Sequence, residues 1–520
     1  MSRPSDPRYR SRDGAPPEDE GGDDEALARA VEGEIEEIGD PEAGPTLPST
    51  TLAAASRAAH PEPIGPRRVA VQTGITGEIV RLAVPVMLSQ VLMSIAGIVD
   101  RMMIGHLGGD IAPATALAAV GYATQLFHLI QSALFAVGLA CVALMARGIG
   151  AGDPARSRAA LASSMQVSVV VTLFFTGVML AAPGPLLGLL GAADEVVDAG
   201  LPYLRLVIGS STILSVSIVL ESALRANKDT RTPMFIGAVV TIVKLGLNWV
   251  LIYGMFGFAP MGLTGAGMAT AISQCVGLLL LVAVFVGKPL DAPDRLLWRE
   301  LGRLNHQTRE VIRIAMPGIG ERVVLNLGLL SYFWVLSESY GTVAVAAYTV
   351  GVPLLSFSWI PGSGYAQACA TLVGQALGAR DPDTATRTGI RAVWLAVGTS
   401  IPLGLFYAVF RQPLGEAFTS DADVIAALGP FMLALAIGQP FLQLHFTLGG
   451  AHRGAGDTWT PMFGAALGNW VFRVPLACLF AFVLQWDVVW VWYALVVDHI
   501  ARSVLLIWSF RRGKWKEQLG

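Results

Sequence analysis

Charged side chains within long apolar segments are the residues of this chain best placed to do chemistry. Asp100 and Lys244 stand inside two such segments, and Asn248 lies one helical turn beyond Lys244 on the same face. Thr270 adds a hydroxyl in the segment that follows. An ionisable group in hydrocarbon is costly unless it faces a partner or a water-filled cavity. These four positions are therefore candidates for coupling to an ion.

Asp100 and Lys244 carry opposite charges, which suggests a switchable pair. Protonation of Asp100, or a substrate that competes for it, would loosen the helices that carry the two residues. The alternative is a static buried pair that holds two helices together. In that case, replacing both residues by apolar ones would leave function intact.

A second polar group lies in the last 200 residues of the chain. Glu321, Arg473 and Asp498 each stand near the middle of an apolar segment. We expect them to form a compensating charge network, or else to line a substrate cavity. Trp359 and Trp470 are candidates for stacking on a flat organic cation, and packing against lipid or core is the alternative.

Other kinds of chemistry find little support in the residues. The four cysteines lie in apolar segments without metal-ligand spacing, so we predict packing roles and no metal site. No Ser, His, Asp constellation and no phosphate-binding glycine loop is apparent, which argues against an enzyme and against ATP as the energy source. No basic domain suggests nucleic acid. We predict no cofactor other than a coupling ion, a proton or sodium.

The segments that must position these residues are long enough to cross a membrane. Hydrophobic residues make up 53% of the chain, charged residues 14%, and the mean hydropathy is +0.57. Runs of about 20 mainly apolar residues each span about 30 Å of hydrocarbon as helices. Twelve are expected, near 79–104, 115–145, 159–182, 199–223, 234–256, 264–287, 310–336, 343–374, 386–410, 424–449, 462–485 and 488–510.

The second six segments repeat the first six. Asp153-Pro154 returns as Asp381-Pro382, and the Asp229-Thr230 stretch returns as Asp457-Thr458, both 228 positions later. An even number of helices per repeat gives the two repeats the same orientation. The predicted fold is therefore an all-α integral membrane protein with twelve transmembrane helices, in two six-helix bundles related by a pseudo-twofold axis along the membrane normal.

Charge predicts the domains and the orientation. Arg and Lys gather in loops on one side, so we expect both termini in the cytoplasm. The expected location is the cell (inner or plasma) membrane, and the expected oligomeric state is a monomer. The acidic, Pro-rich residues 1–70 are expected to be a disordered tail. The further expected divisions are a first bundle at 71–290, a cytoplasmic linker at 291–307, a second bundle at 308–513 and a basic end at 514–520.

Several motifs together resemble the multidrug and toxic compound extrusion (MATE) family. They are Asp100 followed by Ile104-Gly105-His106-Leu107-Gly108, the loop from Arg147 to Asp153, and Leu224-Arg225-Ala226 with Asp229-Thr230-Arg231-Thr232-Pro233, with their echoes in the second repeat. The resemblance covers roughly residues 75–510. It implies a V-shaped pair of six-helix bundles that exports organic compounds in exchange for sodium ions or protons.

The resemblance also implies a cation site, from which this chain departs. One branch of the family has a first-helix Asp, an Asn and an Asp four apart on the fifth helix, and a Thr on the sixth. Asp100 and Thr270 match, but Lys244 and Asn248 stand at the fifth-helix positions. An ammonium there takes the place of a cation, which favours protons over sodium. The site of another branch, a seventh-helix Glu and a tenth-helix Asp, is replaced by Leu325 and Leu442.

The predicted function is a cation-coupled antiporter, with protons favoured over sodium, that exports amphipathic organic compounds by alternating access. Its expected partners are a small organic substrate and membrane lipid. The alternative is a flippase for a lipid-linked saccharide or another lipid. An integral membrane enzyme ranks third.

Overall fold

The computed structural model describes residues 74–106, 113–189, 193–289, 292–295, 306–418 and 421–517. These residues belong to one compact unit, which spans Ala70–Gly520. The expected acidic tail at 1–70 and most of the expected linker at 291–307 lie outside the described residues.

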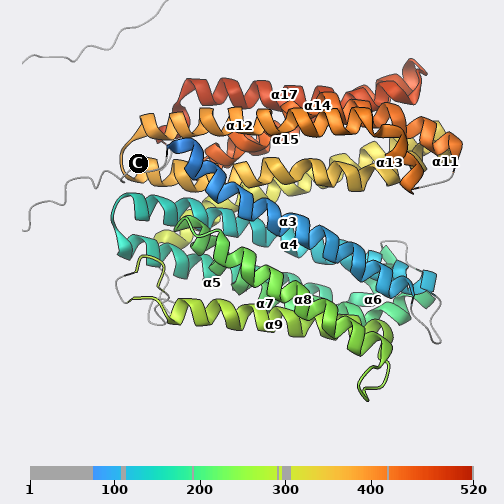
Figure 1. Ribbon diagram of the computed structural model, residues 1–520, viewed down its shortest axis with the longest axis horizontal. Coiled ribbons are helices and arrows are strands. Elements are labelled where there is room, and N and C mark those ends of the chain that lie inside the picture. Colours follow the sequence, from blue (N-terminus) through green and yellow to red (C-terminus); the bar gives the residue numbers. More distant parts are fainter. Residues whose placement is uncertain are drawn as a thin grey trace, which may run out of the picture. The chain divides into compact units, whose positions relative to one another are not determined.

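Six long helices form the first half, and Figure 1 shows them in blue to green. A short helix, α6 (Pro183–Leu189), follows the third of them. The long helices are α3 (Ile75–Gly105), α4 (Pro113–Gly150), α5 (Pro154–Ala181), α7 (Asp194–Ala226), α8 (Arg231–Tyr253) and α9 (Gly262–Val286).

The second half begins with α11 (His306–Gly378), which holds two of the expected segments. Its 73 residues would extend about 110 Å as one straight helix, far more than a bilayer needs. Gly341 breaks it with φ 69° and ψ −161°, so two helices meet there. Of the described helices, eleven are long and apolar enough to cross a membrane, and α11 supplies two crossings. The prediction of twelve spans in an all-α membrane protein is confirmed.

The rest of the second half repeats the first. A short helix, α13 (Arg411–Phe418), begins 228 positions after α6, and no apolar segment predicted either of them. Both copies of the repeated Asp-Pro pair cap a helix, since Asp153 accepts a hydrogen bond from the Arg156 N–H and Asp381 from the Thr384 N–H, each at 2.9 Å. The other long helices are α12 (Pro382–Val409), α14 (Ala422–Gly454) and α17 (Val488–Arg512), and η3 (Lys514–Glu517) ends the described chain.

The fifth helix of the second half differs from its counterpart α8. It runs as α15 (Trp459–Ala466), the π-helix η1 (Leu467–Arg473), α16 (Val474–Cys478) and a second π-helix, η2 (Leu479–Val483). A π-bulge adds one residue to a turn. Arg473 therefore reaches the place equivalent to Lys244, 229 positions earlier.

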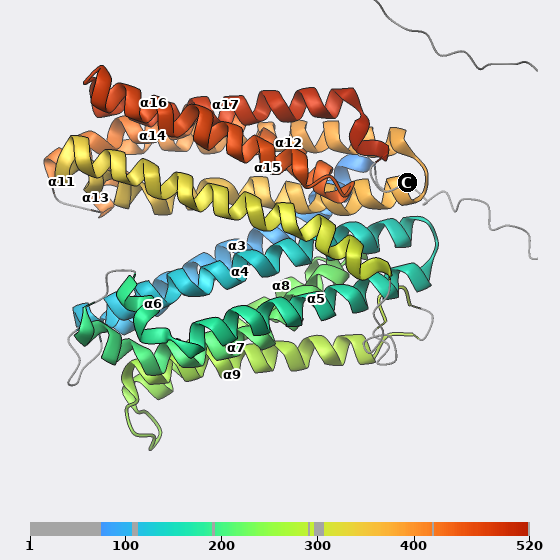
Figure 2. The same ribbon diagram turned by 180° about the vertical axis from the view of Figure 1, so that it is seen from behind.

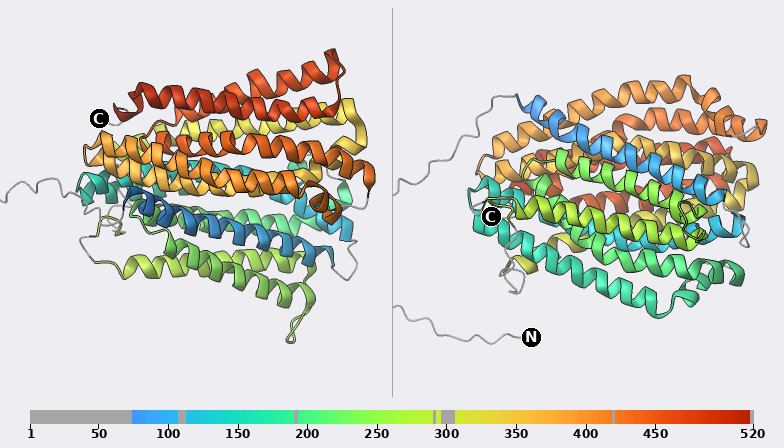
Figure 3. Two further views of the ribbon diagram at one scale, coloured as in Figure 1. Left: turned by 45° about the horizontal axis from the view of Figure 1, so that its top comes forward. Right: turned by 60° about the horizontal axis from the view of Figure 1, so that its bottom comes forward.

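The first helix of each half crosses to the other half. Figures 1 and 2 show α3 starting beside the second half and α11 starting beside the first, and Figure 3 shows the crossing of α3 from two further sides. Val311 and Ala315 at the start of α11 join a core cluster of the first half. Ile79 and Ala83 at the start of α3 join one of the second half. Two further clusters, one in each half, hold buried residues of that half alone.

Polar contacts join the halves at the end where α3 and α11 begin this crossing. The Gln375 amide donates to the Ala226 carbonyl at 2.7 Å, and the Arg391 guanidinium donates to Thr76 at 3.0 Å. Gly150 and Gly378, which are 228 positions apart, press against the backbone of the opposite half, where a Cβ on either would overlap main-chain atoms. The halves are thus held together at this end.

Candidate functional site

The first polar group lies between α3 and α8. The Lys244 Nζ stands 3.0 Å from Asp100 Oδ2, and the Asn248 amide donates to the other carboxylate oxygen. Asn248 is fully buried, whereas the Asp100 and Lys244 side chains keep 13% and 26% of their surface exposed. A one-to-one ion pair with partial exposure can be broken at a lower cost than a fully buried one. The pair is therefore suited to opening, and its role stays a prediction.

Two further atoms complete the description of this site. The Thr270 hydroxyl donates to the Ala266 carbonyl on its own helix at 3.0 Å, so the described contacts do not include one to Asp100. The Asn248 carbonyl oxygen is buried and makes no hydrogen bond within the described chain. It is an acceptor beside Asp100, available to water or to a protonated carboxyl.

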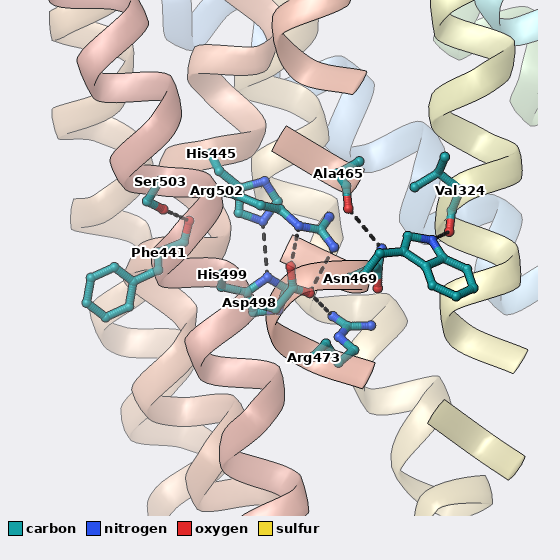
Figure 4. A network of polar contacts seen from close by, with 11 residues as sticks. Val324, Phe441, His445, Ala465, Asn469, Arg473, Asp498, His499, Arg502 and Ser503 are labelled. Atoms are coloured by element: carbon teal, nitrogen blue, oxygen red, sulfur yellow. Dashed lines mark hydrogen bonds and ion pairs between the residues drawn. The ribbon is translucent and has the colours of Figure 1, made fainter. Parts of the chain in front are cut away.

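The second polar group centres on Asp498 in α17 (Figure 4). The Arg473 guanidinium forms an ion pair with Asp498 at 2.5 Å, and Arg502 donates to both carboxylate oxygens at 2.5 and 2.8 Å. Asp498 is fully buried, and both arginines are more than nine-tenths buried. Sequence reasoning named Arg473 and Asp498 but missed Arg502. The signal was available, because Arg502 follows Asp498 by four positions on one helix face.

Two histidines flank this carboxylate, as Figure 4 shows. His445 of α14 and His499 of α17 share a hydrogen bond of 3.2 Å between ring nitrogens, and their rings stack at 5.2 Å. Gly468 in η1 makes room for the cluster, since a Cβ there would overlap the Asp498 carboxylate. The second group is therefore enclosed and tightly packed.

Glu321 pairs with a different residue from those expected. Its carboxylate accepts from the Arg453 guanidinium at 2.6 Å, so within the described contacts it stands apart from the Arg473–Asp498 pair. This ion pair joins α14, which carries Arg453, to α11, which carries Glu321.

The paired turn residues Asp229 and Asp457 have other partners. Asp229 accepts from the Thr232 N–H and hydroxyl, and Asp457 accepts from Thr460 in the same way and from His452 at 2.9 Å. Burial would raise the pKa of the Asp457 carboxyl, but the hydrogen bonds from His452 and Thr460 hold that pKa below its usual value. These turns are organised locally.

The two candidate tryptophans lie at the edge of the second half. Trp359 and Trp470 are 40% and 42% exposed. The Trp470 indole donates to the Val324 carbonyl at 3.3 Å, and Trp359 lies nearly parallel to Phe446 with ring centroids 6.5 Å apart. Stacking on a substrate stays a prediction. Within the described ranges, no group of three or more His, Cys, Asp or Glu side chains is arranged to hold a metal ion.

Comparisons with known proteins agree with this architecture. The family model described as MatE matches residues 85–250 and 317–479, one stretch in each half. The probable multidrug resistance protein NorM of Thermotoga maritima is 30% identical over 454 residues, covering 85% of this chain and 94% of that protein. A NorM of Pseudomonas aeruginosa is 28% identical over 449 residues, covering 84% and 89%.

Solved structures show the same fold. The outward-facing conformation of a multidrug resistance MATE family transporter of the MOP superfamily aligns with a TM-score of 0.78 at 20% identity, over 86% of this chain and 98% of that one. A mutant of the Vibrio cholerae MATE transporter VcmN gives 0.77 at 21%, over 85% and 99%. With a family model that matches more than half of its residues, and with two helical halves of the expected design, the chain belongs to the MatE family of multidrug efflux transporters.

Proposed function

We propose that this transporter exports amphipathic organic compounds in exchange for protons, and that Asp100 is the proton-binding group. The observation that carries the proposal is the ammonium of Lys244, 3.0 Å from the Asp100 carboxylate inside a membrane-length helix pair. Ionisable residues at such depth are rare and mark ion or substrate pathways. The remaining exposure of both side chains leaves a route for a proton.

The same pair argues against sodium as the coupling ion. A hard metal ion needs several oxygen ligands, and Lys244 offers a positive charge where such ligands would stand. A proton needs only the carboxylate. When Asp100 is protonated, it loses a Coulomb attraction to Lys244 of about 5–6 kcal/mol at their separation of 3.0 Å and an effective dielectric constant of 20. The α3–α8 contact then loosens.

Helix α3 would carry this change to the junction between the halves. Its far end bears Asp100, while its start packs into the second half through Ile79 and Ala83. Glu78 at that start also pairs with Lys228 at 2.5 Å. A shift of α3 near Asp100 would therefore also change the contacts that the start of α3 makes at the joined end of the two halves. This geometry supports alternating access.

The orientation follows from charge. The joined end carries Arg147, Arg225 and Arg391, which the positive-inside rule assigns to the cytoplasm. On that assignment, the halves are closed toward the cytoplasm and their separate core clusters lie toward the outside. We infer that the described state is open outward, with both termini inside the cell.

Efflux from proteoliposomes tests the proposal. A fluorescent organic cation would be loaded, and a pH gradient or a sodium gradient imposed separately on wild type and Asp100→Asn. Efflux driven by the pH gradient alone, and lost in Asp100→Asn, is the expected result. Efflux driven by sodium alone would overturn proton coupling. If neither gradient drives efflux while fluorescent lipids are moved across the bilayer, the protein is a flippase.

A further inference from the structure

The charges around Asp498 do not balance. Asp498 contributes one negative charge, and it forms ion pairs with Arg473 and Arg502, which contribute two positive charges. Arginine stays protonated in proteins, so neither can lose its charge. An uncompensated charge in a buried, low-dielectric place is costly. This cluster of three residues leaves one positive charge without a counterion.

The described neighbours do not supply the missing negative charge. His445 and His499 hydrogen-bond to each other through ring nitrogens, so one ring must be the neutral acceptor and neither is anionic. Glu321 is the counterion of Arg453, at 2.6 Å, and that pair is already neutral. None of these neighbours therefore compensates the positive charge of the Arg473–Asp498–Arg502 cluster.

Three buried hydrogen-bond donors near the cluster have no partner within the described chain. They are Arg473 Nε, the Tyr348 hydroxyl and the Trp492 indole nitrogen. Their residues are 7%, 3% and 0% exposed. Buried donors in native proteins are almost always satisfied, and one left unsatisfied costs about 1–3 kcal/mol. An unpartnered donor on Arg473, beside the excess positive charge, points to a missing acceptor.

Aromatic contacts link the residues that carry these donors. The Arg473 guanidinium lies 5.9 Å from the ring centre of Tyr332. The Tyr332 ring lies 5.8 Å from that of Tyr348, which in turn lies parallel to the ring of Trp492 at 6.1 Å. The Tyr332 hydroxyl is already used, since it donates to the Val491 carbonyl at 2.8 Å. The three donors therefore belong to side chains that are joined by successive contacts between α11, η1 and α17.

We propose that the second half binds a small monovalent anion at Arg473, with donors from Tyr348 and Trp492 completing the site. The single excess charge sets the valence of the ligand, and the low exposure of all three residues restricts its size. Chloride fits this description, and so does the carboxylate group of a transported compound. Only the second source rests on the proposed export function, and it would extend the substrates to anionic or zwitterionic compounds.

Equilibrium dialysis of the purified full chain in detergent tests this site. Radiolabelled chloride and radiolabelled acetate would be added separately, in a buffer whose own anion is a bulky sulfonate. We expect saturable binding of about one anion per chain for at least one of the two probes. Saturation by chloride identifies a free ion, whereas saturation by acetate that chloride displaces identifies a carboxylate site. Absence of saturable binding of either probe to folded protein would overturn the proposal.

Two variants and a matched control locate the binding. Arg473→Gln should abolish it, and Tyr348→Phe, which removes one donor and keeps the ring, should weaken it by at least about tenfold. Tyr407→Phe makes the same chemical change at another buried tyrosine of this half, whose hydroxyl donates to the Leu354 carbonyl, and should leave affinity unchanged. Equal affinities of wild type and Tyr348→Phe would contradict the assignment even if Arg473→Gln fails to fold.

The binding assay is independent of transport. Asp100→Asn should bind the anion as wild type does, because Asp100 lies in the other half and no gradient is needed. Loss of proton-driven efflux with intact anion binding would separate failure of the first-half site from failure of this one. Loss of anion binding in Asp100→Asn would contradict a site confined to the second half.

Discussion

The two halves of this transporter handle buried charge in opposite ways. In the first half, Asp100 faces a single Lys244 and both remain partly exposed. In the second, Asp498 lies between Arg473 and Arg502, and all three are enclosed. Both halves have a basic residue on their fifth helix, Lys244 and Arg473. The acidic partner lies on the first helix in the first half and on the sixth helix in the second half.

The chemistry of the two bases explains the difference. Lysine is a compact point charge on a flexible chain, whereas the planar guanidinium of arginine offers several donors in a fixed arrangement. Lys244 donates to one oxygen of Asp100, and this single contact can break, but Asp498 accepts two hydrogen bonds from Arg502 and also forms an ion pair with Arg473. The comparison suggests that the first-half pair opens during transport and that the ion pairs of Asp498 stay intact.

Loss of the second-half acid should have the largest effect. Asp498→Asn leaves Arg473 and Arg502 buried without their carboxylate, and we expect a loss of about 3–5 kcal/mol in stability. Thermal unfolding in one detergent measures it, with Asp100→Asn as the matched change in the first half. If Asp100→Asn lowers the stability as much as Asp498→Asn does, the two sites do not differ in the way that we infer.

Removing both charges of the first-half pair should abolish coupling but preserve the fold. In the double variant Asp100→Leu with Lys244→Leu, proton-driven efflux should fall at least about 100-fold, equivalent to about 2.7 kcal/mol. Stability should remain near that of wild type, because apolar replacement of a buried pair is often neutral. Initial efflux rates at equal protein density would be compared. Retained efflux would identify the pair as a static link between α3 and α8.

Adding one methyl group, by a glycine-to-alanine substitution at each site, compares how tightly the two sites are packed. Gly246, between Lys244 and Asn248, has open space where a Cβ would stand, but at Gly468 a Cβ would overlap Asp498. Gly468→Ala should therefore lose about 1–3 kcal/mol of stability through overpacking. Gly246→Ala should change it by no more than about 1 kcal/mol, and toward greater stability, since alanine favours helix. Equal effects in unfolding measurements would show that the two sites are packed alike.

The helix caps provide the smallest contrast between the halves. Asp381 accepts from both the Thr384 N–H and hydroxyl, whereas Asp153 is recorded accepting from the Arg156 N–H. Asp381→Ala should cost about 1 kcal/mol and Asp153→Ala somewhat less, in the same unfolding measurement. A larger loss in Asp153→Ala would show that the second bond of Asp381 adds nothing.

The cap at Asp381 also has a pH dependence of known sign. The side-chain and backbone hydrogen bonds from Thr384 lower the pKa of the Asp381 carboxyl in the folded state. Its contribution is therefore present above the unfolded pKa, near 4, and is lost as the pH falls through the lower folded value. The stabilities of wild type and Asp381→Ala should therefore become equal in acid. A difference that stays constant from pH 7 to acid would contradict this assignment.

Much of the fold could be predicted because membrane helices are determined locally. Each crossing needs about 20 apolar residues, and the caps at Asp153 and Asp381 need only the residues beside them. The break at Gly341 and the short helices α6 and α13 left a weaker signal. The candidate pair of Asp100 and Lys244 was also accessible to sequence reasoning, because charges in hydrocarbon have few tolerable arrangements.

The sequence by itself determined the class of fold, the repeat, the family and the positions of the rare intramembrane charges. Only the tertiary structure decided which charges meet: Glu321 with Arg453, Arg502 with Asp498, and His445 with His499. It also decided that the π-helix η1, which ends at Arg473, adds the extra residue that brings Arg473 to the position equivalent to Lys244. The physical reason is the separation in sequence over which each effect acts. A membrane helix depends on the consecutive apolar residues of one segment, whereas an ion pair depends on the rotation and register of helices that are distant in sequence.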